Sequence, residues 1–326
     1  MSEVLLDVKN LITAFDTDTG LMRAVDQVSF SVKKRQTLGI VGESGCGKSV
    51  TAMSIVKLLP QPSGRILEGR VHFKGRDLVP LESREMRKIR GNEIGVIFQE
   101  PMTALNPCHR IGKQLSECFL IHKNMNKKEA WEASVEMLKL VRIPAPEHRI
   151  GDYPHQLSGG MRQRIVIALA LACRPDLIIA DEPTTALDVT VQAQILDLIK
   201  EQQEQLGMSM ILITHDLGVI AETCDDVVVM YGGRIVERAP VHEIFHQPRH
   251  AYTRGLLASM PHLETPRKSL LPVIPGMVES LQNFVIGCRF CQRMKRAGAT
   301  TKERPPYREI SPGHWVEACP QCVEGI

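Results

Sequence analysis

Apolar residues occur along the chain in short runs, which are separated by polar turns and by longer amphipathic stretches. Alternation of apolar and polar residues at 28–32 (VSFSV) predicts a half-buried strand, and residues 5–30 as a whole predict strands that turn at 16–20. The pattern at residues 64–73 predicts a β hairpin. Uninterrupted apolar runs predict buried strands at residues 37–41, 94–98, 177–182 and 210–216.

Helical patterns follow most of these runs. They predict helices at residues 50–56, 81–90, 111–122, 127–141 and 191–205. Two late strands are expected at 227–231 and 233–237, around a Gly-Gly turn. Because strand, loop and helix alternate, the chain predicts an α/β domain. The long amphipathic helices between residues 101 and 154 change that pattern and predict a helical insertion.

A glycine-rich loop, GESGCGKS from Gly42 to Ser49, lies between a predicted strand and a predicted helix. Its glycines let the backbone curl so that successive N–H groups point at phosphate oxygens, and the following helix adds its positive N-terminal end. We therefore expect Lys48 to reach the β- and γ-phosphates of a nucleotide and Ser49 to ligate Mg²⁺. A coincidental match is the alternative, and the flanking strand and helix argue against it.

Two adjacent carboxylates, Asp181 and Glu182, end the buried strand predicted at 177–182. Two negative charges so close together at the carboxyl end of a parallel strand repel each other, which raises the free energy of the folded state unless a cation lies nearby. A Mg²⁺ ion held by Asp181 and Ser49, with Glu182 polarising water, meets that need. The next buried strand ends on His215, which is better placed for function than most lone histidines.

Two further features have a structural and a functional interpretation. Ser158, Gly159 and Gly160 precede an apolar helix, where they predict either a second anion site or an ordinary capped helix start. Phe15 precedes the first turn and is a candidate for stacking on an adenine ring, although an aromatic residue in a strand more often belongs to the core.

The composition is that of an ordinary globular protein of 326 residues, with 43% hydrophobic and 24% charged residues. A net charge of +3 is too small to indicate nucleic acid binding. The start of the chain lacks a signal-peptide pattern, and the strongest apolar run, 165–174, is too short to span a membrane. We therefore expect a cytoplasmic chain with reduced cysteines. Five scattered ones are expected to be plain packing residues: Cys46, Cys108, Cys118, Cys173 and Cys224.

This set of motifs, in this order, resembles the ATP-binding subunits of ABC transporters over residues ~3–245. GESGCGKS is similar to Walker A, Gln99 to the Q-loop glutamine, and LSGGM to the LSGGQ signature, with Met161 at its last position. LIIADE resembles Walker B with its catalytic glutamate, residues 186–188 resemble the D-loop, and His215 resembles the switch histidine.

In that family two nucleotide domains close head to tail over two ATP molecules, so the resemblance implies that the LSGG segment serves the ATP of a partner chain. It also implies Glu182 as general base, His215 as a contact to the γ-phosphate, and Gln99 as a sensor of Mg²⁺ that couples to the membrane subunits. The implied catalytic residues are Glu182, His215, Gln99 and Lys48, and the implied Mg²⁺ ligands are Ser49, Gln99 and Asp181. The implied nucleotide-binding residues are Phe15, Gly42, Glu43, Ser44, Gly45, Cys46, Gly47, Lys48, Ser49, Val50, Ser158, Gly159, Gly160 and Asp188.

A closer resemblance is to the ATPases of dipeptide, oligopeptide and nickel importers, above all to the D-type subunits of dipeptide permeases. It rests on FQEPMTALNP at 98–107, YPHQLSGGM at 153–161 and HQPRHAYT at 246–253, where Ala251 replaces the usual proline. Pro272 and a later Pro-Gly pair also match the C-terminal extension of that branch. Peptide is therefore the expected cargo, and nickel or an antimicrobial peptide is the alternative.

Four cysteines near the end of the chain, Cys288, Cys291, Cys319 and Cys322, form two CxxC pairs. In a reducing compartment this pattern is typical of a metal site, either zinc or an iron–sulfur cluster, and reduced thiols on a folded tail are the alternative. The resembling branch often carries a four-cysteine iron–sulfur (4Fe–4S) motif here. Its two middle positions correspond to Met294 and Thr301, so Cys291 and Cys322 either substitute for them or the cluster is lost.

The predicted architecture is a RecA-like P-loop ABC core with an antiparallel β subdomain, an inserted helical subdomain and a small C-terminal extension. The expected boundaries are 1–98 and 161–245 for the two parts of the core, 99–160 for the helical subdomain and 246–326 for the extension.

We expect an active, peripheral ATPase on the cytoplasmic side of the cell (inner) membrane. Its expected partners are a homologous second ATPase subunit, two permeases and an extracytoplasmic binding protein, and not nucleic acid. A soluble ABC ATPase of DNA repair or translation is the other class, but the chain lacks the tandem cassettes or basic arms of such proteins.

Overall fold

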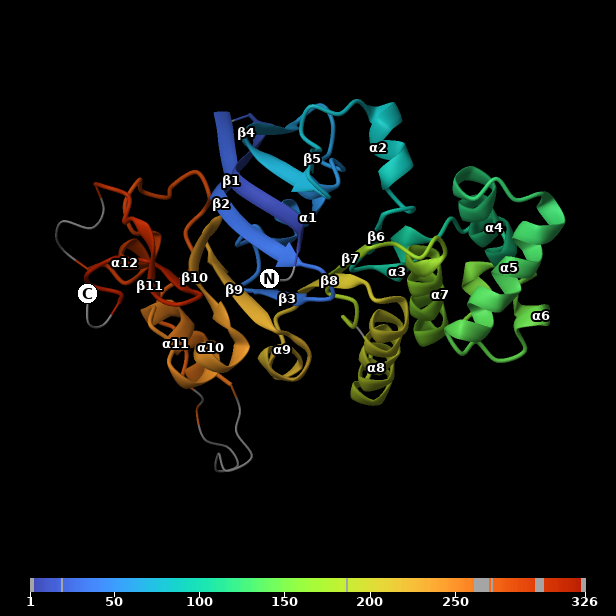
Figure 1. The fold of residues 1–326 in the computed structure, drawn as a ribbon. Coiled ribbons are helices and arrows are strands. Elements are labelled where there is room, and N and C mark those ends of the chain that lie inside the picture. Colours follow the sequence, from blue (N-terminus) through green and yellow to red (C-terminus); the bar gives the residue numbers. More distant parts are fainter. Residues whose placement is uncertain are drawn as a thin grey trace. The chain divides into compact units, whose positions relative to one another are not determined.

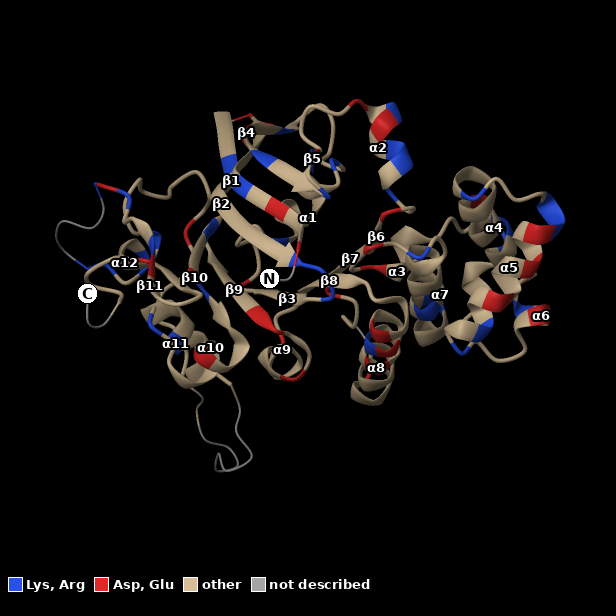
Figure 2. Cartoon of the chain, in the orientation of Figure 1, with Lys and Arg blue, Asp and Glu red and all other residues tan. Residues whose placement is uncertain are grey.

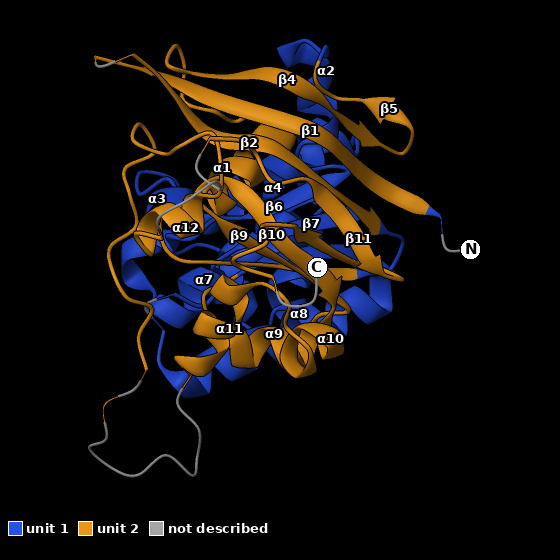
Figure 3. Cartoon of the chain, turned by 90° about the vertical axis from the view of Figure 1, so that its left-hand side faces the viewer, with its two compact units in different colours: residues 1–3, 33–36, 80–213 blue, residues 4–32, 37–79, 214–326 orange. Residues whose placement is uncertain are grey.

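The structure is a computed structural model that describes residues 3–18, 20–185, 187–260, 270, 272–296 and 302–323. The chain forms two compact units, shown in Figure 3. One contains residues 1–3, 33–36 and 80–213, and the other contains residues 4–32, 37–79 and 214–326. Among the described residues, no helix combines the length and the apolar character needed to cross a membrane.

The second unit contains a four-stranded antiparallel sheet. Its strands are β1 (Val4–Thr17), β2 (Gly20–Lys33), β4 (Gly64–Phe73) and β5 (Arg76–Asp77), in the order β2-β1-β4-β5. The two long strands joined by a turn confirm the prediction for residues 5–30. The predicted hairpin at 64–73 is wrong, because β4 runs as one strand along β1. Gly69, at a φ of 102°, takes up a register shift opposite Asn10 and Leu11 rather than a chain reversal.

A second set of strands in this unit has the order β11-β12-β10-β9-β3. β3 (Thr37–Val41) and β9 (Asp226–Tyr231) are parallel, and the other pairs are antiparallel. β10 (Arg234–Pro240) confirms the second late strand, whereas β11 (Tyr307–Ser311) and β12 (His314–Glu317) were not predicted. The helices of this unit are α1 (Lys48–Ile55), α9 (Leu217–Thr223), α10 (Val241–His246), α11 (Ala251–Ala258) and α12 (Arg289–Arg293). In Figure 1 the elements from α10 to β12, coloured orange to red, gather beside β9 and β10.

The first unit contains three parallel strands in the order β8-β7-β6, namely β6 (Ile94–Ile97), β7 (Leu177–Asp181) and β8 (Ser209–Ile213). β8 ends before the predicted residue 216, because Asp216 caps α9 by accepting the N–H groups of Gly218 and Val219. The helices are α2 (Ser83–Ile89), α3 (Pro101–Ala104), α4 (Ile111–His122), α5 (Lys127–Leu140), α6 (Pro146–Arg149), the 3₁₀ helix η1 (Pro154–Gln156), α7 (Gly159–Leu171) and α8 (Val189–Leu206).

The helical segment predicted between residues 101 and 154 is confirmed. Helices α4 and α5 pack on each other and on α7, around the buried side chains of Phe119, Ala130 and Ala172. Figure 2 shows basic and acidic residues interspersed on α5, where Lys139 pairs with Glu136 and Glu147 on the surface. Exposed pairs of this kind contribute little to stability, so the apolar packing holds the helices together.

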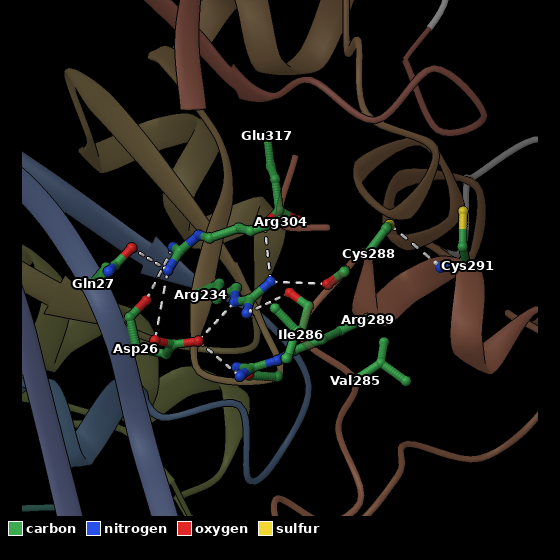
Figure 4. A network of polar contacts seen from close by, with 12 residues as sticks. Asp26, Gln27, Arg234, Val285, Ile286, Cys288, Arg289, Cys291, Arg304 and Glu317 are labelled. Carbon is green, nitrogen blue, oxygen red and sulfur yellow. Dashed lines mark hydrogen bonds and ion pairs between the residues drawn. The ribbon is translucent and has the colours of Figure 1, made fainter. Parts of the chain in front are cut away.

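A buried ionic network fixes the end of the chain to the N-terminal part of the second unit (Figure 4). The Asp26 carboxylate on β2 accepts hydrogen bonds from Arg234 at 2.8 Å and from Arg289 at 2.7 Å, and it lies 3.5 Å from Arg304. Arg234 also pairs with the buried Glu317 at 3.4 Å. Burial alone would raise the pKa of Asp26, but the charges of the three arginines and the hydrogen bond from Arg234 hold that pKa below its ordinary value.

Replacing Asp26 with asparagine should therefore lower the free energy of unfolding by about 3–5 kcal/mol at neutral pH, because it leaves buried guanidinium groups without their counter-charge. Because the pKa of Asp26 is depressed in the folded state, the difference in unfolding free energy between wild type and variant should be fully present above pH 3.8, the ordinary pKa of the group. It should shrink as the pH falls below that value. Urea unfolding at several pH values measures it. The control is Asp7→Asn, which removes a partly exposed pair with Lys9 and should cost less than about 1 kcal/mol. Equal losses in the two variants would contradict the role of the network.

Candidate active site and cysteine centre

The glycine-rich loop of residues 42–49, called the phosphate loop below, connects β3 to α1 in the second unit. Gly42 and Gly47 have φ angles of 150° and 99°, which L side chains rarely adopt. A Cβ atom on Gly42 would overlap the carbonyl oxygen of Met230, and one on Gly47 would lie 2.6 Å from that of Ala24. Backbone packing therefore requires glycine at both positions.

Lys48 begins α1, and its side chain folds back over the loop. Its Nζ atom donates hydrogen bonds to the carbonyl oxygens of Gly42 at 2.7 Å and Glu43 at 3.1 Å, and only 6% of the residue is exposed. The N-cap, Gly47, provides no side-chain cap. The phosphate loop leads directly into the N-terminus of α1, and helix N-termini bind anions through their backbone N–H groups and the positive end of the helix dipole.

The acidic residues lie in the first unit. Asp181 ends β7 and is buried, and Glu182 follows it at a φ of 46°, an unusual backbone conformation for a non-glycine residue. One oxygen of the Glu182 carboxylate, Oε2, accepts hydrogen bonds from Gln99 Nε2 at 3.0 Å and from the Thr185 hydroxyl at 2.9 Å. The structure thus brings Gln99 and Glu182 together. Thr185 was not predicted, although a hydroxyl three residues after an acid is a recognisable signal.

Ser158 and Asp188 both cap helices in the first unit. The Ser158 hydroxyl accepts the N–H of Met161 at 3.3 Å at the start of α7, and Asp188 accepts the N–H of Val191 at 2.9 Å at the start of α8. Gly160 lies against the Val191 side chain, so the two helix starts are neighbours. A Cβ atom added to Gly159 would meet no atom of the described residues within 4 Å outside its chain neighbours and its own helix backbone. Ala186, in the segment that resembles the D-loop, lies outside the described residues.

The remaining candidate residues, His215 and Phe15, belong to the second unit. His215 is exposed between β8 and α9. Phe15 lies in β1, partly exposed, and pairs with Gly64 of β4.

The four C-terminal cysteines converge in the second unit and form what we call the cysteine centre: Cys288, Cys291, Cys319 and Cys322. Their sulfur atoms all lie within 4.8 Å of one another, the side chains are buried, and none forms a disulfide. Sulfur–sulfur distances include 3.3 Å between Cys291 and Cys322 and 3.6 Å between Cys291 and Cys319. Both cysteines that the sequence left uncertain, Cys291 and Cys322, thus belong to the set, while Thr301 lies outside the described residues.

The chemistry of this cluster suits a metal. The hydrogen bond from Cys288 lowers the pKa of the Cys319 thiol, which is the direction that favours a thiolate ligand. Four converging sulfur ligands are the donor set of tetrahedral zinc and of iron–sulfur clusters. Ligand atoms of His250, Cys288 and Glu317 also lie within 4.8 Å of one another, a proximity that no local sequence pattern predicts. Burial lowers the pKa of His250 to about 4, so that imidazole is neutral at physiological pH.

Comparison with known proteins supports the same interpretation. A family model described as ABC transporter matches residues 25–185, and one described as the C-terminal region of oligopeptide/dipeptide transporters matches residues 236–300. The oligopeptide transport ATP-binding protein OppD of Bacillus subtilis is 51% identical over 96% of this chain and 88% of its own. The dipeptide transport ATP-binding protein DppD of the same organism is 54% identical over 89% and 87%. The solved dimeric structure of a bacterial ABC transporter cassette has a TM-score of 0.65 at 28% identity, over 72% of this chain and 98% of that one.

The chain therefore belongs to the ABC transporter family. It is an ATP-binding subunit with ATPase activity, built on the P-loop ABC core that its sequence predicted.

Proposed function

We propose that this chain hydrolyses ATP to drive the uptake of di- or oligopeptides, from the cytoplasmic side of the cell membrane. The observation that carries the cargo assignment is the match of residues 236–300 to the C-terminal region of oligopeptide/dipeptide transporters. The proposed assembly contains a homologous second ATPase subunit, two permeases and an extracytoplasmic peptide-binding protein. The likeness to the oligopeptide transport protein OppD and the dipeptide transport protein DppD supports the peptide cargo.

Uptake assays in cells that lack this chain test the cargo. Loss of labelled dipeptide and oligopeptide uptake with unchanged nickel uptake is the expected result. Loss of nickel uptake alone would overturn the peptide assignment in favour of the metal, and a defect confined to an antimicrobial peptide would overturn it in favour of that cargo. Restoration by the wild-type chain controls for secondary mutations.

Within the site, we infer a division of roles. Lys48 contacts the β- and γ-phosphates, and the helix start at Ser49 and Val50 contributes N–H donors. Mg²⁺, held by Ser49, Gln99 and Asp181, would neutralise phosphate charge. Glu182 takes the proton of the attacking water, because its carboxylate is oriented through Oε2 by Gln99 and Thr185. His215 contacts the γ-phosphate, and Phe15 stacks on the adenine.

We further propose that the site is completed by a second ATPase subunit. Ser158, Gly159 and Gly160 would bind the γ-phosphate of ATP held by that partner, with Asp188 beside them. The open surroundings of Gly159 and the neighbouring starts of α7 and α8 support this role. A solved relative is a dimer, which supports pairing without deciding whether the partner is identical or homologous. The boundaries between the four predicted segments remain predictions.

We also propose that the cysteine centre binds zinc or a 4Fe–4S cluster. Anaerobically purified chain should contain about one zinc or about four iron atoms, and Cys291→Ser should lose most of that metal. Metal analysis with visible absorption distinguishes the two centres. The control is Cys108→Ser, which changes an exposed thiol outside the centre. Fewer than about 0.1 metal atoms per wild-type chain would contradict the proposal.

A further inference from the structure

Glu43, the second residue of the phosphate loop, is held twice by the C-terminal part of the chain. Its carboxylate oxygen Oε2 lies 2.6 Å from Arg293 Nη1, and its backbone N–H donates to the Tyr252 hydroxyl oxygen at 2.9 Å. Both partners belong to the same compact unit as the loop. Since Lys48 donates to the carbonyl oxygen of Glu43, a shift of Glu43 also moves the acceptor that orients the phosphate-binding lysine.

Arg293 lies on the short helix that carries the first cysteine pair, and its own hydrogen bonds hold its side chain. It ends the short helix α12, which begins after Cys288 and contains Cys291. Besides Glu43, the guanidinium donates to the carbonyl oxygens of Pro275 at 2.9 Å, Ile274 at 3.1 Å and Gly276 at 3.2 Å. Only 4% of the side chain is exposed. The planar guanidinium of Arg293 is therefore held by several hydrogen bonds at once, and it forms a rigid connection between α12 and the phosphate loop.

Tyr252 is connected to the second cysteine pair through the backbone of its helix. It is the second residue of α11, whose first residue, Ala251, donates its N–H to the carbonyl oxygen of Cys322 at 2.7 Å. The Tyr252 ring is fully buried and packs against Phe290, with ring centroids 5.6 Å apart. Phe290 lies between Cys288 and Cys291 in the sequence. The two CxxC pairs thus reach Glu43 by two routes, one through a side chain and one through the backbone.

We propose that Arg293 and Tyr252 are positioning residues for the phosphate loop, and that through them the affinity for ATP depends on metal in the cysteine centre. This inference rests on the proposed metal centre and on nucleotide binding by the loop. With metal bound, the four sulfurs fix α12 and the turn at Cys319–Cys322 relative to each other, and Glu43 is held in place. Without metal, the four buried thiols lose the metal that they share, and the contacts of Arg293 and Tyr252 with Glu43 become looser. The loop must then be ordered when it binds nucleotide, and this ordering costs free energy.

The test measures the dissociation constant of Mg²⁺-ATP for metal-loaded and chelator-treated full-length chain, in the wild type and in Arg293→Gln. Metal removal should weaken ATP binding by wild type within the usual coupling range, about 5- to 150-fold. Arg293→Gln should weaken binding by a similar factor while it retains metal, and its affinity should respond much less to chelation. Glu43→Gln should behave like Arg293→Gln, and the double variant should be no worse than either single one. Lys295→Gln, an exposed neutralisation next to α12, is the matched control and should behave as wild type.

Steady-state kinetics separate positioning from general destabilisation. Arg293→Gln and Tyr252→Phe should raise KM for ATP with kcat nearly unchanged, because the residues proposed for chemistry are untouched. Equal responses of wild type and Arg293→Gln to chelation, at normal metal content, would overturn the coupling while leaving the metal centre intact. Absence of metal from the wild type would overturn both, and metal analysis shows this before nucleotide is added. Failure of the metal-loaded wild type to bind ATP would instead refute the nucleotide site.

Discussion

Replacing Glu182 with glutamine should reduce kcat for ATP hydrolysis by about 10²- to 10⁴-fold and leave ATP affinity unchanged. Glutamine keeps the shape of the side chain, and its carbonyl oxygen can still accept the hydrogen bonds of Gln99 and Thr185. The amide cannot take a proton from water, so only the chemical step is lost. Phosphate release under saturating ATP measures the effect, together with nucleotide binding.

The same variant should accumulate as a closed, ATP-bound dimer, because hydrolysis no longer separates the two ATPase subunits. Size-exclusion chromatography with and without Mg²⁺-ATP shows whether this occurs. Glu204→Gln, an exposed change on α8, controls for the loss of a carboxylate from the same unit. Near-normal turnover by Glu182→Gln would refute its role as general base.

Replacing Lys48 with alanine should weaken ATP binding by roughly 10- to 150-fold, the equivalent of about 1.5–3 kcal/mol for a hydrogen bond to a charged group. The variant removes the loop's only cationic side chain and also the two hydrogen bonds from Nζ to the carbonyl oxygens of Gly42 and Glu43. Equilibrium titration with a fluorescent ATP analogue measures the loss. Lys74→Ala, an exposed lysine in the same unit, should bind as wild type does. Unchanged affinity of Lys48→Ala would remove the phosphate-loop assignment.

Much of the fold was predictable because its signals are local. The strand–loop–helix order around Gly42–Ser49 depends on neighbouring residues alone, and α4 starts and ends where its periodicity predicts, at Ile111–His122. The hairpin prediction at 64–73 failed because Gly69 has the appearance of a turn residue, and only pairing with the long β1 shows that it is a bulge.

The candidate site was predictable to the extent that sequence motifs mark it. The four cysteines were identified by their spacing, and they do converge. The connection from Arg293 to Glu43 was not predictable, because 250 residues separate them and neither residue type marks the pair. The strands β11 and β12 were missed for a related reason. They are short, and their stability depends on distant partners, among them Arg234, which pairs with Glu317.

Peptide transport by the reconstituted assembly tests the central claim most directly. The complex, purified through a tag on this chain, is placed in proteoliposomes with ATP on the side of the ATPase subunits and a labelled peptide bound to the extracytoplasmic protein on the other side. The account predicts peptide accumulation that requires hydrolysable ATP and is lost in Glu182→Gln. Accumulation that continues without ATP hydrolysis, or that is equal in wild type and Glu182→Gln, would contradict it.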